Sequence, residues 1–539
     1  MKRMLAIFLA LFLCTGCANT NIGETNKRHT YQSRFSSEQT IELSDSGIKQ
    51  NGEPVGETGS IYVSHDIIYY EDKESYDSGM PYGEGTKEER HTQEEALAHT
   101  VLNITESGAY RISGTLSAGQ IRVDLGENAK ENSESVVELI LDNANITCSV
   151  APAILFMNVY ECDYAWSTET AKADVDTKDV GAVLVFADGS ENNIQGSHVA
   201  KIFKDQEGEK KLWKQDGAIY SYMSMNVFGG GTLNLVADNE GMDTELHLTI
   251  NGGNLNIYSD NDGINTNEDG VSVTTINGGN IKIVAGLGVE GDGIDSNGWL
   301  MINGGTVLAS ANPKADAGLD SDMGSYINGG TVIAFGSTMD WPESDSEQVT
   351  MNLQFAKAQN ATDGVVIKDS DGKEIFVYEP VKEVKAEGQN RDYQGAVISS
   401  PELEVGKEYS LYIGGVKQGY TGTDIFGGPG GFHGMKPSEM GERPPEEMPE
   451  MPGDFEGKMP PRPQGEQGQD FKGKGWRPDF ADGEMPKKPE GGWGEMPKGE
   501  FPEWMGEAPL DGDPQPIEQK TNFVMTDKVN RFSGVSAEE

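Results

Sequence analysis

The sequence predicts an all-β protein whose main part is a parallel β-helix, and three observations carry this prediction. Short segments of alternating apolar and polar residues follow one another from Ile121 to Ser337, with no amphipathic helix of useful length between them. An Asp-Gly-apolar-Asp/Asn motif recurs, as in DGID at 292–295, and an Asn-Gly-Gly motif recurs behind it, as at 303–305. Both motifs return after about 22 to 30 residues, a period typical of folds built from stacked repeats.

Alignment of the repeats places apolar residues in two columns, two residues apart along each strand. Side chains two residues apart point to the same face of a strand, so we expect both columns inside the protein. The columns are Leu233, Leu255, Ile281, Val307 and Val332, and then Leu235, Ile257, Ile283, Ala309 and Ala334. We expect the column between them to face outward: Asn234, Asn256, Lys282, Leu308 and Ile333. Stacked asparagines can hydrogen-bond along such a column, and the Asn-Gly-Gly glycines supply the backbone angles of a corner.

Composition divides the chain into six segments. They are a signal peptide at 1–17, a polar tether at 18–60, the β-helix at 61–337, a small antiparallel β cap at 338–426, a loop at 427–516, and a returning strand with a tail at 517–539. The loop is rich in Gly, Pro, Met and Glu, cannot bury a core, and is predicted to be disordered.

The N-terminus is similar to a bacterial lipoprotein signal. A basic start and a short apolar run from Leu5 to Leu13 precede the sequence CTGC, in which Cys17 would be lipidated. We therefore expect an extracellular protein anchored by lipid to the outside of a bacterial membrane, with ordinary secretion as the alternative. In that oxidising exterior, Cys148 and Cys162 either form a disulfide or serve as small buried residues.

The charge balance excludes one class of partner. The chain has 42 basic and 88 acidic residues and a net charge of -46. Such a chain repels nucleic acid and anionic membrane surfaces, and it suits a calcium-rich exterior.

The first motif suggests a calcium site. Its apolar residue points inward, so its polar neighbours point outward, and successive repeats would bring carboxylates within about 5 to 8 Å of one another. That repulsion is costly unless a cation lies among the carboxylates, and calcium takes six to eight oxygen ligands in flexible geometry. The alternative is a solvated, turn-forming face. The candidate ligands are Asp262, Asn265, Asn267, Asp292, Asp295, Asn297, Asp320 and Asp322.

Several segments together resemble a known family. The repeats DGINTN and DGIDSNG, the leading GAYRISGTLSAGQIRV, the cap segment GAVISSPELEVGKEYSLYIGG and the closing FSGV are similar to secreted carbohydrate-binding β-helix proteins related to pectate-lyase-type polysaccharide lyases. The resemblance covers roughly residues 101–424 and the last strand. It implies a right-handed parallel β-helix, bound calcium, and binding of cellulose or an acidic plant polysaccharide such as polygalacturonate.

Three functions follow as hypotheses. The first is a monomeric, non-catalytic polysaccharide-binding protein in which calcium bridges protein and uronate carboxylates and exposed Trp299 or Tyr326 stacks on a sugar. The second is a calcium-dependent lyase, which needs a base near the uronate C5; Lys282 and Lys314 lie near the acidic repeats, but no paired base with an orienting partner is visible. The third is a surface scaffold acting through the 427–516 loop. We expect binding rather than cleavage.

Overall fold

The computed structural model describes residues 31–70, 90–163, 167–203, 211–337, 341–380, 391–423 and 519–538, without the side chains of 201–203 and 211–214. The described chain is nearly all β: it contains one α-helix, α1 (Gln93–Leu97), and one 3-10 turn, η1 (Glu127–Glu131). No helix among these residues is long and apolar enough to cross a membrane. The signal peptide, Cys17 and the 427–516 loop lie outside the described residues.

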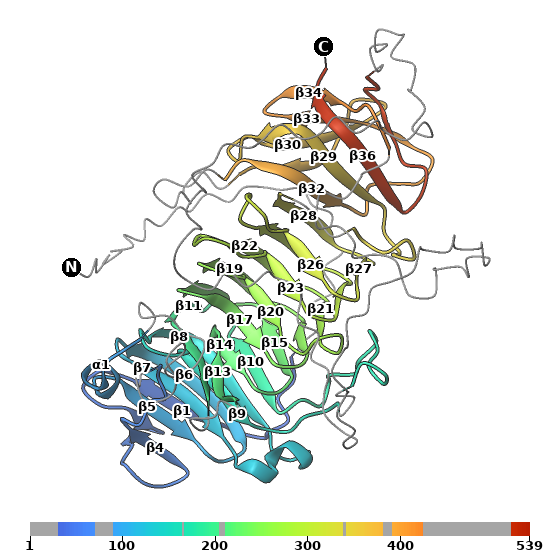
Figure 1. The fold of residues 1–539 in the computed structure, drawn as a ribbon. Helices are drawn as coiled ribbons and strands as arrows, with labels where there is room; N and C mark the ends of the chain where they lie inside the picture. The colour runs from blue at the N-terminus through green and yellow to red at the C-terminus, as the bar shows by residue number, and fades with distance from the viewer. Residues whose placement is uncertain are drawn as a thin grey trace, which may run out of the picture. The chain divides into compact units, whose positions relative to one another are not determined.

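The repeats build three ladders of parallel strands (Figure 1). From β14 onward the chain visits the first, second and third ladder in turn, so each repeat adds one strand to each ladder. The first ladder contains β5 (Thr100–Ile104), β7 (Gly119–Asp124), β9 (Ile154–Asn158), β14 (Gly217–Ser221), β17 (Glu240–Thr244), β20 (Ile264–Thr266), β23 (Ile294–Ser296) and β26 (Leu319–Ser321).

The other two ladders share their first strands, β6 (Gly108–Leu116) and the long β8 (Val137–Thr147). The second ladder continues with β10 (Ala182–Phe186), β15 (Met225–Gly229), β18 (Leu248–Ile250), β21 (Val273–Ile276), β24 (Trp299–Ile302) and β27 (Gly324–Ile327). The third continues with β11 (Glu191–Gly196), β16 (Thr232–Ala237), β19 (Asn254–Ser259), β22 (Asn280–Val284), β25 (Thr306–Ser310) and β28 (Thr331–Gly336). Between β11 and β14 the chain forms a separate antiparallel pair, β12 (Val199–Phe203) and β13 (Lys211–Gln215).

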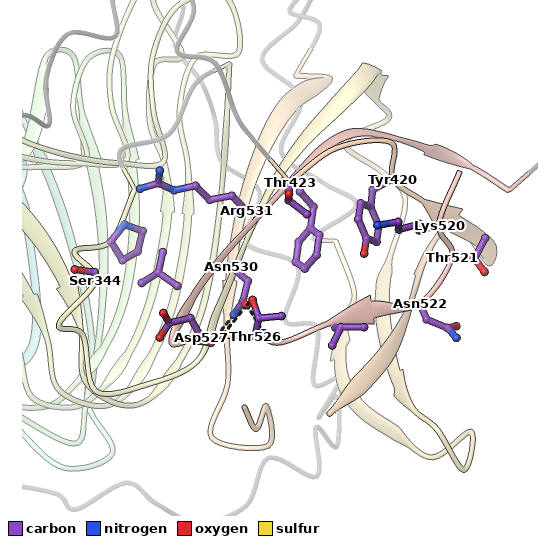
Figure 2. A pocket seen from close by; sticks show the side chains of 14 residues that line it. Ser344, Tyr420, Thr423, Lys520, Thr521, Asn522, Thr526, Asp527, Asn530 and Arg531 are labelled. Carbon is purple, nitrogen blue, oxygen red and sulfur yellow. Dashed lines mark hydrogen bonds between the residues drawn. The ribbon is translucent and has the colours of Figure 1, made fainter. Parts of the chain in front are cut away.

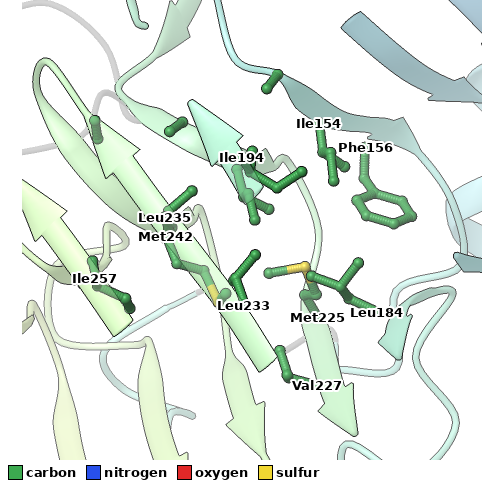
Figure 3. Close-up of a cluster of buried hydrophobic side chains, with 14 of the residues drawn as sticks. Ile154, Phe156, Leu184, Ile194, Met225, Val227, Leu233, Leu235, Met242 and Ile257 are labelled. Atoms are coloured by element: carbon green, nitrogen blue, oxygen red, sulfur yellow. The ribbon is translucent and has the colours of Figure 1, made fainter. Parts of the chain in front are cut away.

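The predicted apolar columns are confirmed. Leu255 pairs in register with Ile281, and Ile281 pairs with Val307. All three side chains are fully buried, and they belong to the same cluster as the first-ladder column Met242, Ile264 and Ile294. Figure 3 shows part of this core, in which Leu233 and Leu235 lie close to Met242 between the ladders. The core therefore fills the space that the three ladders enclose.

Asparagine ladders accompany the apolar columns, as predicted. The Asn277 amide donates to the Oδ1 of Asn251, and the Asn303 amide donates to the Oδ1 of Asn277, both at 3.0 Å. The glycines that close these corners adopt the left-handed region, with φ of 104° at Gly253 and 83° at Gly305. Only glycine takes up this conformation without strain, which explains the Asn-Gly-Gly motif.

The polar tether predicted for residues 18–60 is corrected for its described part. β1 (Glu38–Leu43) pairs in parallel with β6, and short β2 (Lys49–Gln50) and β3 (Glu53–Pro54) extend it. Ile41 and Leu43 are buried in the main core. The strand β1 contributes these two buried side chains, and Ile48, just before β2, is buried in the same core although the rest of the segment is polar.

The first end of the ladders is closed by local structure. β4 (Ile61–Ser64) pairs antiparallel with β5. The short helix α1 follows a capping box in which Thr92 and Glu95 satisfy each other's backbone N–H groups, and it buries Ala96.

In the region predicted to form an antiparallel cap, most strand pairs are antiparallel, but the returning strand β36 runs parallel to β29. The cap contains β29 (Thr350–Gln359), β30 (Val365–Asp369), β31 (Glu374–Tyr378), β32 (Tyr393–Ser399), β33 (Glu408–Ile413), β34 (Val416–Gly419), β35 (Phe523–Val524) and β36 (Val529–Ala537). Its strand β32 pairs antiparallel with β28, so the cap covers the last strand of the third ladder. The strand β36 pairs with β29 and β34, which brings the chain back across the long loop.

The two cysteines within the described chain are free thiols. Cys148 is fully buried and Cys162 is partly buried, and burial raises the pKa of the Cys148 thiol to about 12. Of the two alternatives, the structure therefore shows small buried residues and no disulfide.

We predict that the inward column carries much of the stability. Ile281→Ala removes a side chain that is fully buried between repeats, so it should lower the free energy of unfolding by about 2–5 kcal/mol. The adjacent outward Lys282→Ala is the matched control and should change it by less than about 0.5 kcal/mol. Denaturant unfolding followed by circular dichroism measures both, and equal effects would contradict the inward assignment.

Candidate metal site on the acidic column

Polar residues of the last four first-ladder strands form an acidic column, in which each follows the inward apolar residue of its strand. Asp243, Asn265, Asp295 and Asp320 pair one to the next through the register of β17, β20, β23 and β26. The neighbouring residues Met242, Ile264 and Ile294 are fully buried on the inner side. The alternation that makes the core therefore also aligns these polar side chains on the outer face of the ladder.

Corner carboxylates join successive repeats. The backbone N–H of Asp292 donates to the Oδ1 of Asp262 at 2.6 Å, and the backbone N–H of Ala317 donates to the Oδ1 of Asp292 at 2.5 Å. The N–H of Gly291 donates in the same way to the Oδ2 of Asp316 at 2.9 Å. Asp262 and Asp292 thus each satisfy a backbone donor of the next repeat, and Asp316 satisfies one of the previous repeat. The motif alone did not reveal this structural role.

Burial and the crowding of carboxylates raise the pKa values of two corner acids, Asp262 and Asp292. Burial is the main cause that raises the pKa of Asp262 well above its usual value, and Glu240, Asp295 and Asp292 raise it further. Burial likewise raises the pKa of Asp292, with further contributions from Asp320, Asp295 and Asp316. Like charges in neighbouring repeats make the ionised form unfavourable, so the site favours either a proton or a cation.

Three acids converge at one end of the column. One carboxylate oxygen each from Asp216, Glu240 and Asp243 lie within 4.8 Å of one another. Glu240 is 5% exposed, and its Oε2 accepts no hydrogen bond. In the next repeat the Oδ1 of Asn265, which is 6% exposed, also lacks a donor. Buried oxygens without a donor are rare because they lose their hydration without replacement.

Neither Asp216 nor Glu240 is among the eight predicted ligands, although each begins a copy of the first motif. The copy at 216–219 is early and degenerate, and the copy at 240–243 has Glu for the first Asp. The structure also shifts the early copy at 216–219 by one residue, because Gly217 pairs with Glu240 and Tyr220 pairs with Asp243. The backbone N–H of Glu240 donates to the carbonyl of Asp216 at 3.2 Å, so these two residues remain adjacent despite the shift. The repeated Asp/Glu-Gly motif was the available signal for this cluster.

The structure separates the eight predicted ligands into two groups. Asp262, Asn265, Asp292, Asp295 and Asp320 lie in or beside the acidic column. Asn267, Asn297 and Asp322 follow the strands. Of these, Asn267 donates to the Oδ1 of Asp243 at 2.7 Å, which links it to the converging acids, whereas Asn297 donates to Asp269 at 3.2 Å.

Trp299, Tyr326 and Lys282 lie on other ladders, whereas Lys314 lies in the segment that leads into the first-ladder strand β26. Trp299 and Tyr326 are partly exposed on the second ladder, where Trp299 pairs with Gly324 and Tyr326 pairs with Met301. Lys282 is exposed on the third ladder, and Lys314 is exposed ahead of β26.

A separate hollow of about 900 Å³ lies on the cap (Figure 2). Tyr420, Lys520, Asn530 and Arg531 line it, and the Arg531 guanidinium stacks on Trp341 at 3.9 Å from the ring centroid. None of the eight predicted ligands lines this hollow.

Comparison with known proteins identifies the family. Residues 98–371, just over half of the chain, match the family of carbohydrate-binding domain-containing proteins. The chain belongs to this family. A carbohydrate-binding domain-containing protein of Acetivibrio thermocellus is 29% identical over 156 residues, which cover 29% of this chain and 44% of that protein. The match therefore spans less than half the length of that relative.

One solved structure is also similar. It is the polysaccharide lyase-like protein from C. thermocellum, determined as a gadolinium derivative, with 21% identity. The likeness covers 55% of this chain and 93% of that chain, with a TM-score of 0.32. A TM-score of this size is too low to establish a shared fold.

We predict that the metal-free protein loses stability as the pH rises. The pKa values of Asp262 and Asp292 in the folded protein lie above the unfolded value near 3.8. Protonation of these two carboxyls therefore contributes its full stability below that pH, and the contribution is lost as the pH rises through the raised pKa values. Asp262→Asn keeps the acceptor for Asp292 without the charge. In chelator at pH 7, the Asp262→Asn variant should therefore be more stable than the wild type by about 1–3 kcal/mol.

Urea unfolding in chelator at pH 4 and pH 7 tests this prediction. The exposed Asp345→Asn is the control and should have little effect at either pH. The prediction is contradicted if the free energy of unfolding of the wild type is higher at pH 7 than at pH 4 and Asp262→Asn does not change it.

Proposed function

We propose that this member of the carbohydrate-binding domain family is an extracellular, non-catalytic protein that binds acidic plant cell-wall polysaccharide through calcium. We also propose that its three parallel ladders form a right-handed parallel β-helix. The observation that carries the functional proposal is the convergence of Asp216, Glu240 and Asp243, together with the buried Oε2 of Glu240 that lacks a donor.

Calcium fits this donor set better than other common metals. Its ligands lie 2.3–2.6 Å from the ion, so two oxygens of one shell are separated by at most about 5 Å. The three carboxylate oxygens within 4.8 Å of one another satisfy that limit. The set offers only oxygen, which favours calcium over the nitrogen- and sulfur-preferring zinc. Asp216, Glu240, Asp243 and the Oδ1 of Asn265 would hold the ion.

The acidic column offers further carboxylates next to the cluster. Asp295 and Asp320 are partly exposed, unlike the buried Asp243 and Asn265. A calcium ion bound farther along the column, beside Asp295 and Asp320, would keep coordination sites open to solvent, and a uronate carboxylate could occupy them. Without the cation a chain of charge -46 would repel a polyuronate, so binding should depend on calcium. Trp299 and Tyr326 are our candidates for stacking on sugar rings.

Cleavage is the less supported alternative. A lyase needs a base close to the calcium-bound uronate. Of the two candidate lysines, Lys282 lies on the third ladder, whereas the acidic column lies on the first.

The scaffold alternative depends on the 427–516 loop. Deletion of that loop separates it from the proposed function: unchanged glycan retention would point to the ladders, and lost retention would point to the loop.

We predict that Asp295→Ala weakens calcium binding and, with it, polygalacturonate binding. Removing one carboxylate from the column lowers its attraction for the ion, and about tenfold weaker calcium binding corresponds to 1.4 kcal/mol. Binding of polygalacturonate should fall by a similar factor. Calorimetry with calcium chloride, followed by polygalacturonate titration in calcium and in chelator, measures both effects.

The exposed cap residue Asp371 supplies the control, since Asp371→Ala removes the same charge from the chain at a distant turn. It should leave both affinities unchanged. If the wild type takes up no calcium, or if Asp295→Ala shows the same calcium dependence as the wild type, these acids form a solvated face and not a calcium site.

We propose further that Cys17 is lipidated and holds the protein on the outside of the cell membrane. Cys17→Ser should then release the protein into the medium, because one lipidated residue provides the anchor. Fractionation of cells and medium by immunoblot measures this. Retention of Cys17→Ser in the membrane fraction would show a different anchor.

A further inference from the structure

The cap contains a strand, β36, whose second edge is only partly used. On its first edge β36 pairs with β29, and the Thr350 N–H donates to the Lys528 carbonyl at 2.7 Å. On its second edge the later part is occupied, since the Ser533 N–H donates to the Gly422 carbonyl at 2.9 Å. Within the described chain, no residue pairs with 529–531 on this second edge.

The backbone groups of Val529 and Arg531 point to this open edge. The N–H and C=O of one strand residue point to the same edge, and those of the next residue point to the opposite edge. Lys528 bonds to β29, whereas Ser533 bonds on the other side, so Val529 and Arg531 share the edge of Ser533. Two N–H donors and two carbonyl acceptors therefore face away from β29, about 6.7 Å apart along the strand.

The hollow on the cap lies along this edge. Its lining includes the four consecutive β36 residues 529–532, so the open edge borders a space of about 900 Å³ and not packed protein. In Figure 2, Lys520 and Asn522 lie across the hollow from Arg531 and Asp527. The hollow is therefore a slot between β36 and the segment that leads into β35.

The slot has an apolar, aromatic lining beside the polar strand edge. Tyr420 and Phe532 are buried, and their rings pack edge to face with centroids 4.8 Å apart. Val524 and Val529 also line the slot. A peptide strand presents its side chains alternately to two faces, so alternate residues of a bound strand would meet this apolar lining.

The charges of the slot differ from those of the whole chain. Two basic residues and one acidic residue, Lys520, Arg531 and Asp527, line the slot, whereas the chain has 42 basic and 88 acidic residues. Arg531 already stacks on Trp341, but Lys520 forms no ion pair with a described residue. An acidic side chain of a ligand would be complementary to the Lys520 end of the slot.

We propose that this slot binds an extended peptide segment of another protein, which adds a strand to the open edge of β36. Main-chain hydrogen bonds to Val529 and Arg531 supply affinity, and the lining selects alternate side chains. The bound strand runs antiparallel to β36, as Gly422 does on the same edge, and carries an acidic residue near Lys520. Only a polypeptide backbone offers N–H and C=O groups with the strand repeat, so the edge favours peptide over polysaccharide.

This inference goes beyond the proposed function. Apart from Pro342 and Ser344, the residues that line the slot lie outside 98–371, the part of the chain that matches the carbohydrate-binding domain family. None of the proposed calcium ligands lines the slot. Peptide binding should therefore be independent of calcium.

Fluorescence anisotropy with labelled ten-residue peptides that alternate Val and Thr tests the proposal. Each Thr in turn is replaced by Asp or by Lys. The best Asp peptide should bind the wild type saturably and roughly tenfold more tightly than its Lys counterpart. Lys520→Glu should reverse this preference, and Lys407→Glu, on an exposed turn of the cap, is the matched control that should retain it.

Two N-methylated versions of the best peptide separate main-chain pairing from side-chain contact. Methyl groups on every second nitrogen block one edge of the peptide strand, so one version should lose binding by roughly tenfold or more and the other should retain it. Val529→Pro removes an N–H that faces the slot and none that bonds to β29, so it should weaken binding similarly. Circular dichroism checks that Val529→Pro folds, and the two methylated peptides keep the test valid if it does not.

Three results would overturn the proposal: no peptide binds the wild type, both methylated versions bind equally, or folded Val529→Pro binds like the wild type. Binding of polygalacturonate that Lys520→Glu abolishes, without peptide binding, would also overturn it and assign the slot to glycan. Chelator and Asp295→Ala should leave peptide binding unchanged. Failure of the proposed calcium site would therefore be distinguishable from failure of the slot.

Discussion

The in-register parallel pairing of successive repeats is the constraint on which the rest of the structure depends. It places the same position of each repeat directly beside its equivalent, one strand spacing away. An apolar position then becomes a core column, as with Leu255, Ile281 and Val307. An asparagine becomes a hydrogen-bonded ladder, whereas an aspartate becomes a row of like charges. The same geometry therefore stabilises the core and destabilises the acidic column.

Much of this could be predicted because the repeat is local. The inward columns and the Asn-Gly-Gly corners follow from period and backbone chemistry, and the structure confirms them. The three-ladder arrangement was not visible, because strands such as Leu248–Ile250 are too short to show alternation. The pairing of β1 with β6 joins segments about 70 residues apart, and a polar segment with two buried side chains gives no sign of its partner. The one-residue register shift between β14 and β17 is likewise visible only in the paired strands.

Outward positions are free to differ between ladders, because the core constrains only the inward ones. The first ladder presents Asp243, Asn265, Asp295 and Asp320, whereas the third ladder presents amides and a short apolar column. One repeat can thus support two chemically distinct surfaces.

We propose that a cation balances the crowded carboxylates of the acidic column. Crystals grown with calcium chloride, with anomalous diffraction recorded at a wavelength where calcium scatters anomalously, locate that ion directly. The account predicts an anomalous peak bound by Asp216, Glu240 and Asp243, with ligand distances of about 2.3–2.6 Å. A map with no peak at these residues, in crystals that contain millimolar calcium, would contradict it.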